Sequence, residues 1–91
     1  MSRHDPATLL DTLDARANDS PDVPALVFVE RDDERTISYG HLRRRAHAIA
    51  VALRERFAAG DRVLLVYAPG VEYIEAFFGC LYAGLIAVPA Y

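Results

Sequence analysis

The sequence predicts an α/β fold, and three observations support this prediction. Apolar residues recur at helical spacing in two segments of the first sixty residues. Two short runs rich in β-branched and aromatic residues lie between them and indicate a β-hairpin. Residues 62–89 follow a strand, helix, strand pattern, which is typical of a parallel β-α-β unit. The predicted order is therefore an N-terminal helix, a β-hairpin, an amphipathic helix and a parallel β-α-β unit, in at most one domain of 91 residues.

The first helix is predicted to begin at Pro6. Asp5 is a favourable N-cap residue, and proline is tolerated at the first helical position because its missing N–H would have no partner there. The apolar residues that follow at helical spacing are Leu9, Leu10, Leu13 and Ala17. The turn-forming residues and the proline at 18–21 are predicted to end the helix.

The next two segments, 25–30 and 35–39, are predicted to be antiparallel strands. Both are rich in residues that favour strands, and the polar sequence RDDE at 31–34 predicts a four-residue turn between them. A second helix follows, with Ser38 as its predicted N-cap and Ala59-Gly60 as its predicted end. Its continuous apolar stripe is formed by Leu42, Ala46, Ile49, Ala50, Leu53 and Phe57.

This second helix carries three consecutive arginines, Arg43, Arg44 and Arg45, which suggest a hypothesis of phosphate or nucleic-acid binding. Three consecutive helical residues spread over about 200°, so these side chains do not converge on one ligand. We interpret them as a solvated helix face. His41 and His47 have no cysteine or second histidine at i+4 spacing, so we interpret both as surface residues and not as metal ligands.

The β-α-β unit begins with the apolar run VLLVY at 63–67, the kind of strand found where both faces of a parallel sheet are covered. The turn at 68–70 leads into a predicted helix over 71–84, closed by Gly84, and 85–89 begin another strand. Past Glu75 the helix is apolar on every side, so we predict that it is buried inside something larger. The sequence does not contain the partners for these surfaces.

Three features of this unit could carry chemistry, and each has a structural interpretation. The turn at 68–70 has one glycine and matches neither G-x-G-x-x-G nor G-x-x-x-x-G-K, so we interpret it as a structural turn. Glu72 and Glu75 are interpreted as first-turn residues that complement the helix dipole, not as an acid/base pair. Cys80 lies in an apolar run without cationic neighbours and is interpreted as a small buried hydrophobe, not a reactive thiol. No catalytic, cofactor-binding or metal-binding residue is predicted.

Composition excludes several classes of protein. A net charge of −3, with thirteen acids interspersed among ten arginines, gives no electrostatic reason to bind nucleic acid. A membrane-spanning helix needs about 20 apolar residues. The apolar run 76–91 is shorter and contains two glycines and a proline, so no membrane span is predicted. The N-terminal residues lack the apolar core of a secretory signal, and a lone cysteine indicates a reducing compartment, so a cytoplasmic location is expected.

The segment GDRVLLVYAPGVEYIEAFFGCLYAGLIAVPAY at 60–91 resembles the early part of the adenylate-forming ligases: acyl-CoA synthetases, luciferases and peptide-synthetase adenylation domains. TISYGHLRRRAHAIAVAL at 36–53 resembles the strand-to-helix signature T-[YF]-x-x-L upstream in the same superfamily. Within it, AFFGCLYAGLIAVPAY is most similar to the fatty acyl-AMP ligases. Acyl-CoA synthetases more often have a lysine before the Ala-Gly pair, where this chain has Tyr82.

The resemblance implies a reaction of a fatty acid with ATP and Mg²⁺ to give an acyl-adenylate and pyrophosphate, followed by acyl transfer to the phosphopantetheine thiol of an acyl carrier protein. It also implies that residues 1–91 are a partial AMP-binding N-terminal domain, truncated before the phosphate loop. That loop, the residues that hold adenine, ribose and magnesium, and the catalytic lysine of the family have no counterpart here, and the chain has no lysine at all. We therefore expect no adenylation, and no bound ATP or Mg²⁺, from these 91 residues alone.

Two hypotheses about function remain open at this point. The chain is either the N-terminal piece of a fatty acyl-AMP ligase, as a short product, a truncation or one part of a split enzyme, or a free-standing interaction module. The module would pair with itself or with a partner chain through an apolar helix and an exposed sheet edge. The sequence does not decide the acyl chain length, the oligomeric state, or whether an acyl carrier protein or coenzyme A accepts the acyl group.

Overall fold

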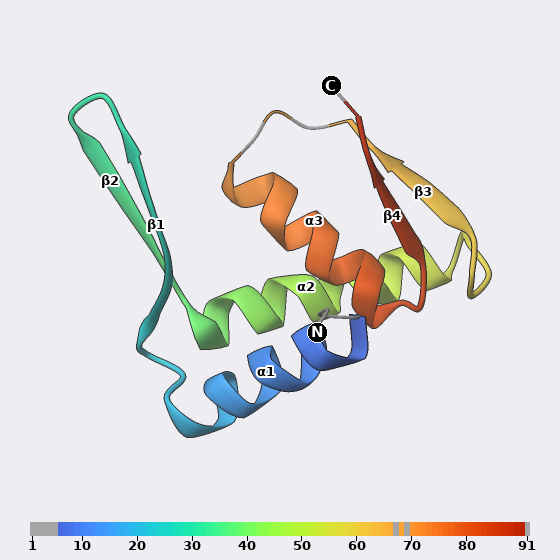
Figure 1. Ribbon diagram of the computed structural model, residues 1–91, viewed down its shortest axis with the longest axis horizontal. Helices are drawn as coiled ribbons and strands as arrows, with labels where there is room; N and C mark the ends of the chain where they lie inside the picture. Colours follow the sequence, from blue (N-terminus) through green and yellow to red (C-terminus); the bar gives the residue numbers. More distant parts are fainter. Residues whose placement is uncertain (1–5, 67, 69, 91) are drawn as a thin grey trace, which may run out of the picture. The chain divides into compact units, whose positions relative to one another are not determined.

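The computed structural model describes residues 6–66, Ala68 and residues 70–90. The chain divides into two compact units, Met1–Arg43 and Arg44–Tyr91. Its helices and strands, in chain order, are α1 (Pro6–Asp19), β1 (Pro24–Glu30), β2 (Asp33–Ser38), α2 (Tyr39–Arg54), β3 (Arg62–Leu65), α3 (Val71–Tyr82) and β4 (Ile86–Pro89) (Figure 1). The predicted order of helix, hairpin, amphipathic helix and β-α-β unit is confirmed, and α2 runs from the first unit into the second.

In the first unit, β1 and β2 form an antiparallel hairpin (Figure 1). Its last pair of opposed residues is Glu30 and Asp33, so the turn has two residues and the prediction of a four-residue turn over 31–34 is wrong. Two-residue hairpin turns of the favoured types need a positive φ at their first central residue. Arg31 supplies it with a φ of 57°, a conformation that the sequence did not indicate because arginine rarely adopts it.

The polar start of α2 anchors the base of the hairpin. The backbone N–H of His41 donates a hydrogen bond of 3.2 Å to Ser38 Oγ, which confirms Ser38 as the N-cap. The backbone N–H groups of Tyr39 and Gly40 donate to the carbonyls of Val23 and Pro21, so the chain before β1 is fixed to the chain after β2. The buried apolar residues of this unit are Leu13, Ala17, Ile37 and Leu42. The predicted N-cap of α1, Asp5, lies outside the described residues.

In the second unit, β3 and β4 run parallel, with Val63 opposite Ala87 and Leu64 opposite Val88, and α3 makes the connection between them. This confirms the predicted β-α-β unit. Figure 1 shows α3 alongside the paired strands, and one hydrophobic cluster joins the helix to the sheet. The buried members of that cluster are Ala50, Leu65, Ala76, Cys80, Ala83 and Leu85.

The C-terminal end of α3 is a Schellman motif. The N–H of Gly84 donates to the carbonyl of Leu81, and the N–H of Leu85 donates to the carbonyl of Cys80. Gly84 has the positive φ, 75°, that this ending requires, so its predicted role as the helix terminator is confirmed. The motif turns the chain directly into β4 and thereby fixes where the helix and the strand meet.

The largest correction concerns which apolar surface remains exposed. Both the helix at 71–84 and the final strand were predicted to lack partners within the chain. The large apolar side chains of α3 are buried or half-buried, and none is among the exposed large hydrophobic residues of the described chain. The strands expose Leu64 and Ile86, at 59% and 48%, and Val66, which directly follows β3, is 70% exposed. The prediction that both faces of the strand at 63–67 are covered is therefore wrong within these 91 residues, since α3 covers one face only.

Element boundaries differ from the predicted ones by a few residues. α2 ends at Arg54 and not at Ala59-Gly60, so Phe57 lies outside the helix and is 38% exposed. The strand at 63–67 is Arg62–Leu65, and the strand at 85–89 is Ile86–Pro89. The bounds of the two strands follow from their pairing, because only four residues of each strand lie opposite a residue of the other.

Candidate functional site

The connection between β3 and α3 lies at the carboxyl end of a parallel strand, where α/β proteins commonly bind ligands. Its predicted residues are 68–70, of which Pro69 lies outside the described part of the chain. Gly70 precedes α3 with a φ of 159° and a ψ of −167°, a combination that is essentially restricted to glycine. Its carbonyl accepts a hydrogen bond of 3.2 Å from the N–H of Ile74, and no side chain caps the helix. The single glycine of the predicted structural turn therefore has a conformational role.

Glu75 is the feature of α3 that the sequence interpretation missed. It was assigned with Glu72 to a first turn that complements the helix dipole, but only Glu72 belongs to that turn and is exposed, whereas Glu75 is 6% exposed. One of its carboxylate oxygens lies 3.7 Å from Nε of Arg45 on α2, whose side chain is 52% exposed. A buried carboxylate needs such a partner because the loss of hydration is expensive. The sequence signal was that Glu75 is the single charged residue between 73 and 84.

The interpretation of the arginine cluster as a solvated face is correct for Arg44 and Arg45, which are exposed, although Arg45 also contacts Glu75, and it is wrong for Arg43, which is half-buried. Nη1 of Arg43 donates to Oδ1 of Asn18 over 2.9 Å and lies 3.7 Å from a carboxylate oxygen of Asp14, so this arginine links α2 to α1 within the first unit. Arg44, between them, is exposed. The three side chains do diverge, as predicted, but two of them are structural.

The two histidines do not meet. His41 is half-buried near the start of α2, so its interpretation as a surface residue is only partly correct. His47 is exposed, and its ring makes an edge contact with Tyr82 on α3, with 4.3 Å between ring centroids and 88° between ring planes. Tyr82 is the residue found where acyl-CoA synthetases more often have lysine. Its ring thus packs against α2.

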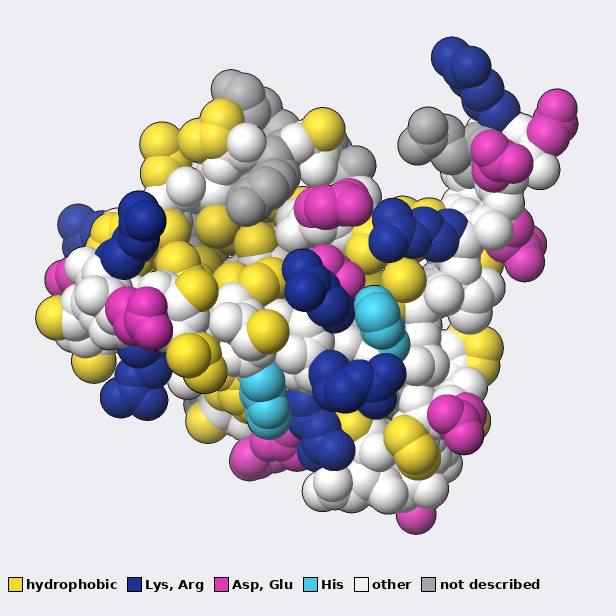
Figure 2. All heavy atoms as spheres, turned by 180° about the vertical axis from the view of Figure 1, so that it is seen from behind, with side chains coloured by type: hydrophobic (Ala, Val, Ile, Leu, Met, Phe, Trp, Pro, Cys, Tyr) yellow, Lys and Arg dark blue, Asp and Glu magenta, His cyan; other side chains and the backbone are white. Residues whose placement is uncertain are grey.

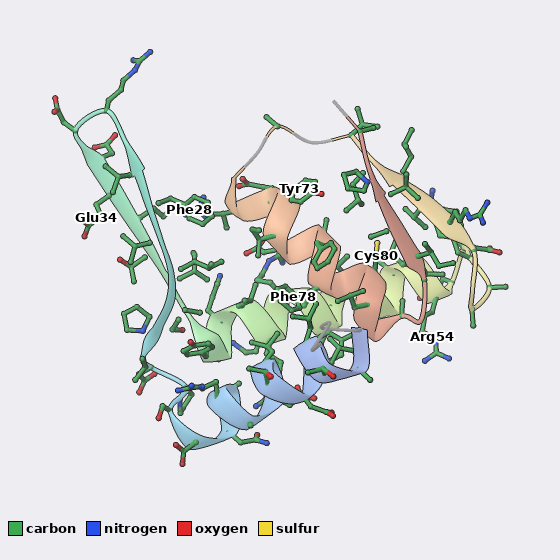
Figure 3. All side chains as sticks on the ribbon, in the orientation of Figure 1. Phe28, Glu34, Arg54, Tyr73, Phe78 and Cys80 are labelled. Carbon is green, nitrogen blue, oxygen red and sulfur yellow. The ribbon has the colours of Figure 1, made fainter. Side chains whose placement is uncertain are left out.

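Cys80 is fully buried in the cluster between α3 and the strands (Figure 3). Burial raises the pKa of its thiol above the ordinary value of 9.0, because desolvation disfavours the thiolate. A neutral, enclosed thiol is a poor nucleophile. The interpretation of Cys80 as a small hydrophobe is confirmed by this burial.

Gly79 brings α2 and α3 unusually close together. A Cβ built at this position would lie 2.5 Å from Cγ2 of Ile49, 2.9 Å from Cβ of Ile49 and 3.3 Å from the carbonyl oxygen of Ala46. No larger residue fits here without movement of α2. The contact shows why this helix contains a glycine despite the low helix propensity of glycine.

Within residues 6–66, 68 and 70–90, no group of three or more histidine, cysteine or acidic side chains is arranged to hold a metal ion. In the same part of the chain, no helix has the length and apolar character that crossing a bilayer requires. The described residues therefore offer parts of a framework, namely the glycine turn, the ion pair and the helix contact.

Comparison with known proteins supplies the family. Residues 13–91 match the family model described as AMP-binding enzyme. The chain belongs to this family. The match covers the second half of α1 and every later helix and strand.

Individual members of the AMP-binding family agree with the predicted resemblance to fatty acyl-AMP ligases. The chain is 39% identical to the medium-chain-fatty-acid--[acyl-carrier-protein] ligase JamA of Moorena producens, over 99% of this chain and 16% of that protein. It is 40% identical to the 4-hydroxyphenylalkanoate adenylyltransferase of Mycobacterium marinum, over 91% of this chain and 14% of that protein. The crystal structure of the fatty acyl-adenylate ligase of L. pneumophila, in complex with acyl adenylate and pyrophosphate, matches with a TM-score of 0.87 and 48% identity, over 91% of this chain and 15% of that one.

These matches confirm the resemblance and the α/β fold class. They also show that the chain spans about a sixth of the length of these relatives. The family assignment therefore describes a segment of an adenylate-forming ligase fold.

Proposed function

We propose that these 91 residues are the N-terminal part of the AMP-binding domain of a fatty acid-activating ligase, ending before the phosphate loop. The observation that supports this best is the 48% identity and the TM-score of 0.87 to the L. pneumophila fatty acyl-adenylate ligase across 91% of the chain. In the proposed enzyme, a fatty acid carboxylate attacks the α-phosphorus of ATP, pyrophosphate leaves, and an acyl-adenylate forms. Mg²⁺ would neutralise the charge of the phosphates.

The proposed second step is transfer of the acyl group to the thiol of an acyl carrier protein, with AMP as the leaving group. JamA, which is 39% identical to this chain, carries the carrier protein in its name. The proposal gives the present residues a structural role: the parallel pair, α3 and the Glu75–Arg45 contact form the framework on which other residues of the ligase act. The 91 residues alone would be inactive, because they contain no lysine and no phosphate loop.

A chimera tests this proposal directly. The matching 15% of the L. pneumophila ligase is replaced by the present chain, and fatty acid-dependent exchange of pyrophosphate into ATP is measured. We expect exchange by the chimera and none by the isolated 91 residues. A control chimera with Gly79→Leu, which forces a large side chain against Ile49, should lose exchange. A folded chimera without exchange would overturn the assignment, and exchange by the isolated chain would overturn its predicted inactivity.

A second candidate function, a free-standing interaction module, is favoured by the exposed apolar side chains of Leu64 and Ile86 on the strands and of Val66 directly after β3. Sedimentation of the isolated chain separates the two hypotheses when it is combined with the chimera. A module would form a discrete oligomer that Leu64→Ser with Val66→Ser converts to a monomer, and the chimera would be inactive. A ligase segment would give an active chimera whatever the association state of the isolated chain.

A further inference from the structure

Basic charge is concentrated in one short segment of this acidic chain. Residues 39–56 contain five of the ten arginines and a single acid, Glu55, which gives this segment a net charge of +4 while the remaining residues carry −7. The segment is α2 together with the two residues that follow it. Such a separation of charge creates a local positive field on a molecule that is negative overall.

The arginines of α2 have two different roles. Arg43 and Arg45 are engaged by Asn18, Asp14 and Glu75. Arg44 and Arg54 are exposed, and within the described residues no ion pair or hydrogen bond of their side chains is found. The stability of the two units therefore does not account for the charge of these two residues.

The two unused arginines share one face of the helix. Arg44, His47, Val51 and Arg54 recur at intervals of three and four residues, which places them along one stripe, and all four are exposed. We call this stripe the basic face. Arginine and histidine side chains lie next to one another in Figure 2, and Arg54 points away from the hydrophobic cluster in Figure 3. Val51, in the middle of the stripe, is 63% exposed.

The composition of the basic face indicates the kind of partner. Its ends are about 15 Å apart along the helix axis, which is the length of about three helical turns. Arginines around an exposed apolar centre match the anatomy of a protein interface, in which an apolar core is surrounded by a polar rim. Duplex nucleic acid and anionic membranes are bound through larger clusters of basic residues, whereas the basic face offers two unused arginines.

We propose that the basic face docks an acidic amphipathic helix of a partner protein, with carboxylates of that helix placed against Arg44 and Arg54 and an apolar side chain against Val51. Under the proposed function, on which this identification of the partner rests, the protein that presents the helix is the acyl carrier protein. Glu55 is the exposed acid next to Arg54, and its charge would repel a partner carboxylate placed beside it. The carboxylate that pairs with Arg54 is therefore expected on the side of Arg54 that faces away from Glu55.

The experiment uses a fluorescent 15-residue helical peptide with glutamates on both sides of a leucine ridge, titrated with the 91-residue chain and followed by fluorescence anisotropy. Arg44→Glu with Arg54→Glu should weaken binding about tenfold or more, and Val51→Ser several-fold. The matched control is Arg16→Glu with Arg31→Glu, which makes the same change in net charge at exposed positions outside α2 and should leave the affinity within about twofold.

Equal losses in the two double variants would overturn the proposal, because binding would then follow net charge alone. Equal or tighter binding of a duplex oligonucleotide, of anionic vesicles or of a peptide with lysine in place of glutamate would overturn it as well. Circular dichroism identifies any variant that fails to fold, and its titration is then repeated with the same substitutions in the chimera.

The carrier protein is tested separately, in the unsubstituted chimera. Failure of pyrophosphate exchange there means that the proposed function has failed, whereas the peptide titration still decides whether the basic face binds an acidic helix. Where exchange is present, the Arg44→Glu, Arg54→Glu chimera should transfer the acyl group to a carrier protein at a rate that falls about tenfold at low carrier concentration. An unchanged transfer rate would overturn the assignment of the carrier protein as the partner.

Discussion

The two sheets found in the described part of the chain have two strands each but are opposite in construction. The hairpin β1–β2 is antiparallel and closed by a two-residue turn, whereas β3–β4 is parallel and needs all of α3 to connect its strands. The hairpin exposes Val27 and Val29, at 55% and 71%, while the parallel pair buries Leu65 against α3 at 4%. A two-stranded sheet is marginally stable by itself. The comparison indicates that, beyond the buried Ile37 near its base, the hairpin is held by local pairing, whereas packing against a helix holds the parallel pair.

Two adjacent leucines of β3 provide the strongest test of this difference. Leu65→Ala should lower the free energy of unfolding of the second unit by about 2–5 kcal/mol, because it leaves a cavity beneath α3. Leu64→Ala removes the same atoms from the opposite, 59% exposed face and should change this free energy by less than about 0.5 kcal/mol. Urea unfolding followed by circular dichroism measures both. Similar losses for the two variants would mean that the exposed face is covered in solution.

Gly79→Ala tests the contact between α2 and α3 by the sign of its effect. In an exposed helix this change stabilises by about 0.5–1 kcal/mol, because alanine has the higher helix propensity. Here the new Cβ would meet Ile49 at 2.5 Å, so we expect destabilisation of about 1–3 kcal/mol. The double variant with Ile49→Ala should lose less stability than the sum of the two single losses. A stabilising Gly79→Ala would contradict the close contact, and thermal unfolding would reveal it.

The contact between Glu75 and Arg45 is expected to contribute less, because half of the arginine side chain is in water. A double-mutant cycle with Glu75→Gln and Arg45→Met should give a coupling energy of about 0.5–1 kcal/mol. The matched control is a second cycle in which Glu72→Gln takes the place of Glu75→Gln. Glu72 is the exposed acid of the same helix and should show no coupling to Arg45. Coupling of equal size at Glu72 would show that the field of the arginine, and not the contact, is being measured.

The parts of the fold that could be predicted are those in which the signal is local. The stop at Gly84, the cap at Ser38 and the β-α-β order follow from residue type and spacing, and the structure confirms them. Apolar spacing also identified Cys80 as a buried residue. These features depend on neighbours that lie within a few positions of one another, or on a simple pattern of apolar residues.

The parts that could not be predicted depend on residues far apart in the sequence. The burial of Glu75 follows from the position of Arg45, thirty residues earlier, and the role of Arg43 follows from Asn18 and Asp14. Which face of β3 is covered depends on the side of the sheet on which α3 packs, and a run of five apolar residues does not encode that side. For the candidate site, the sequence indicated the turn before α3 and its glycine at 70, but not the buried contact between Glu75 and Arg45.

The smallest expected effect concerns the hairpin turn and tests the stability of the hairpin, the other of the two sheets. Arg31 has a φ of 57°, where a side chain is unfavourable, so Arg31→Gly should stabilise the hairpin by about 0.5–1 kcal/mol. Asp32, at the neighbouring turn position, is not among the residues of positive φ, so Asp32→Gly should give no gain in stability. Amide hydrogen exchange of β1 and β2 measures the effect within the first unit.

Slower exchange confined to the hairpin would confirm that its stability is set by the turn. Slower exchange of β3 and β4 to the same extent would mean that the two sheets unfold together, in which case the distinction between local pairing and helix-dependent packing does not hold.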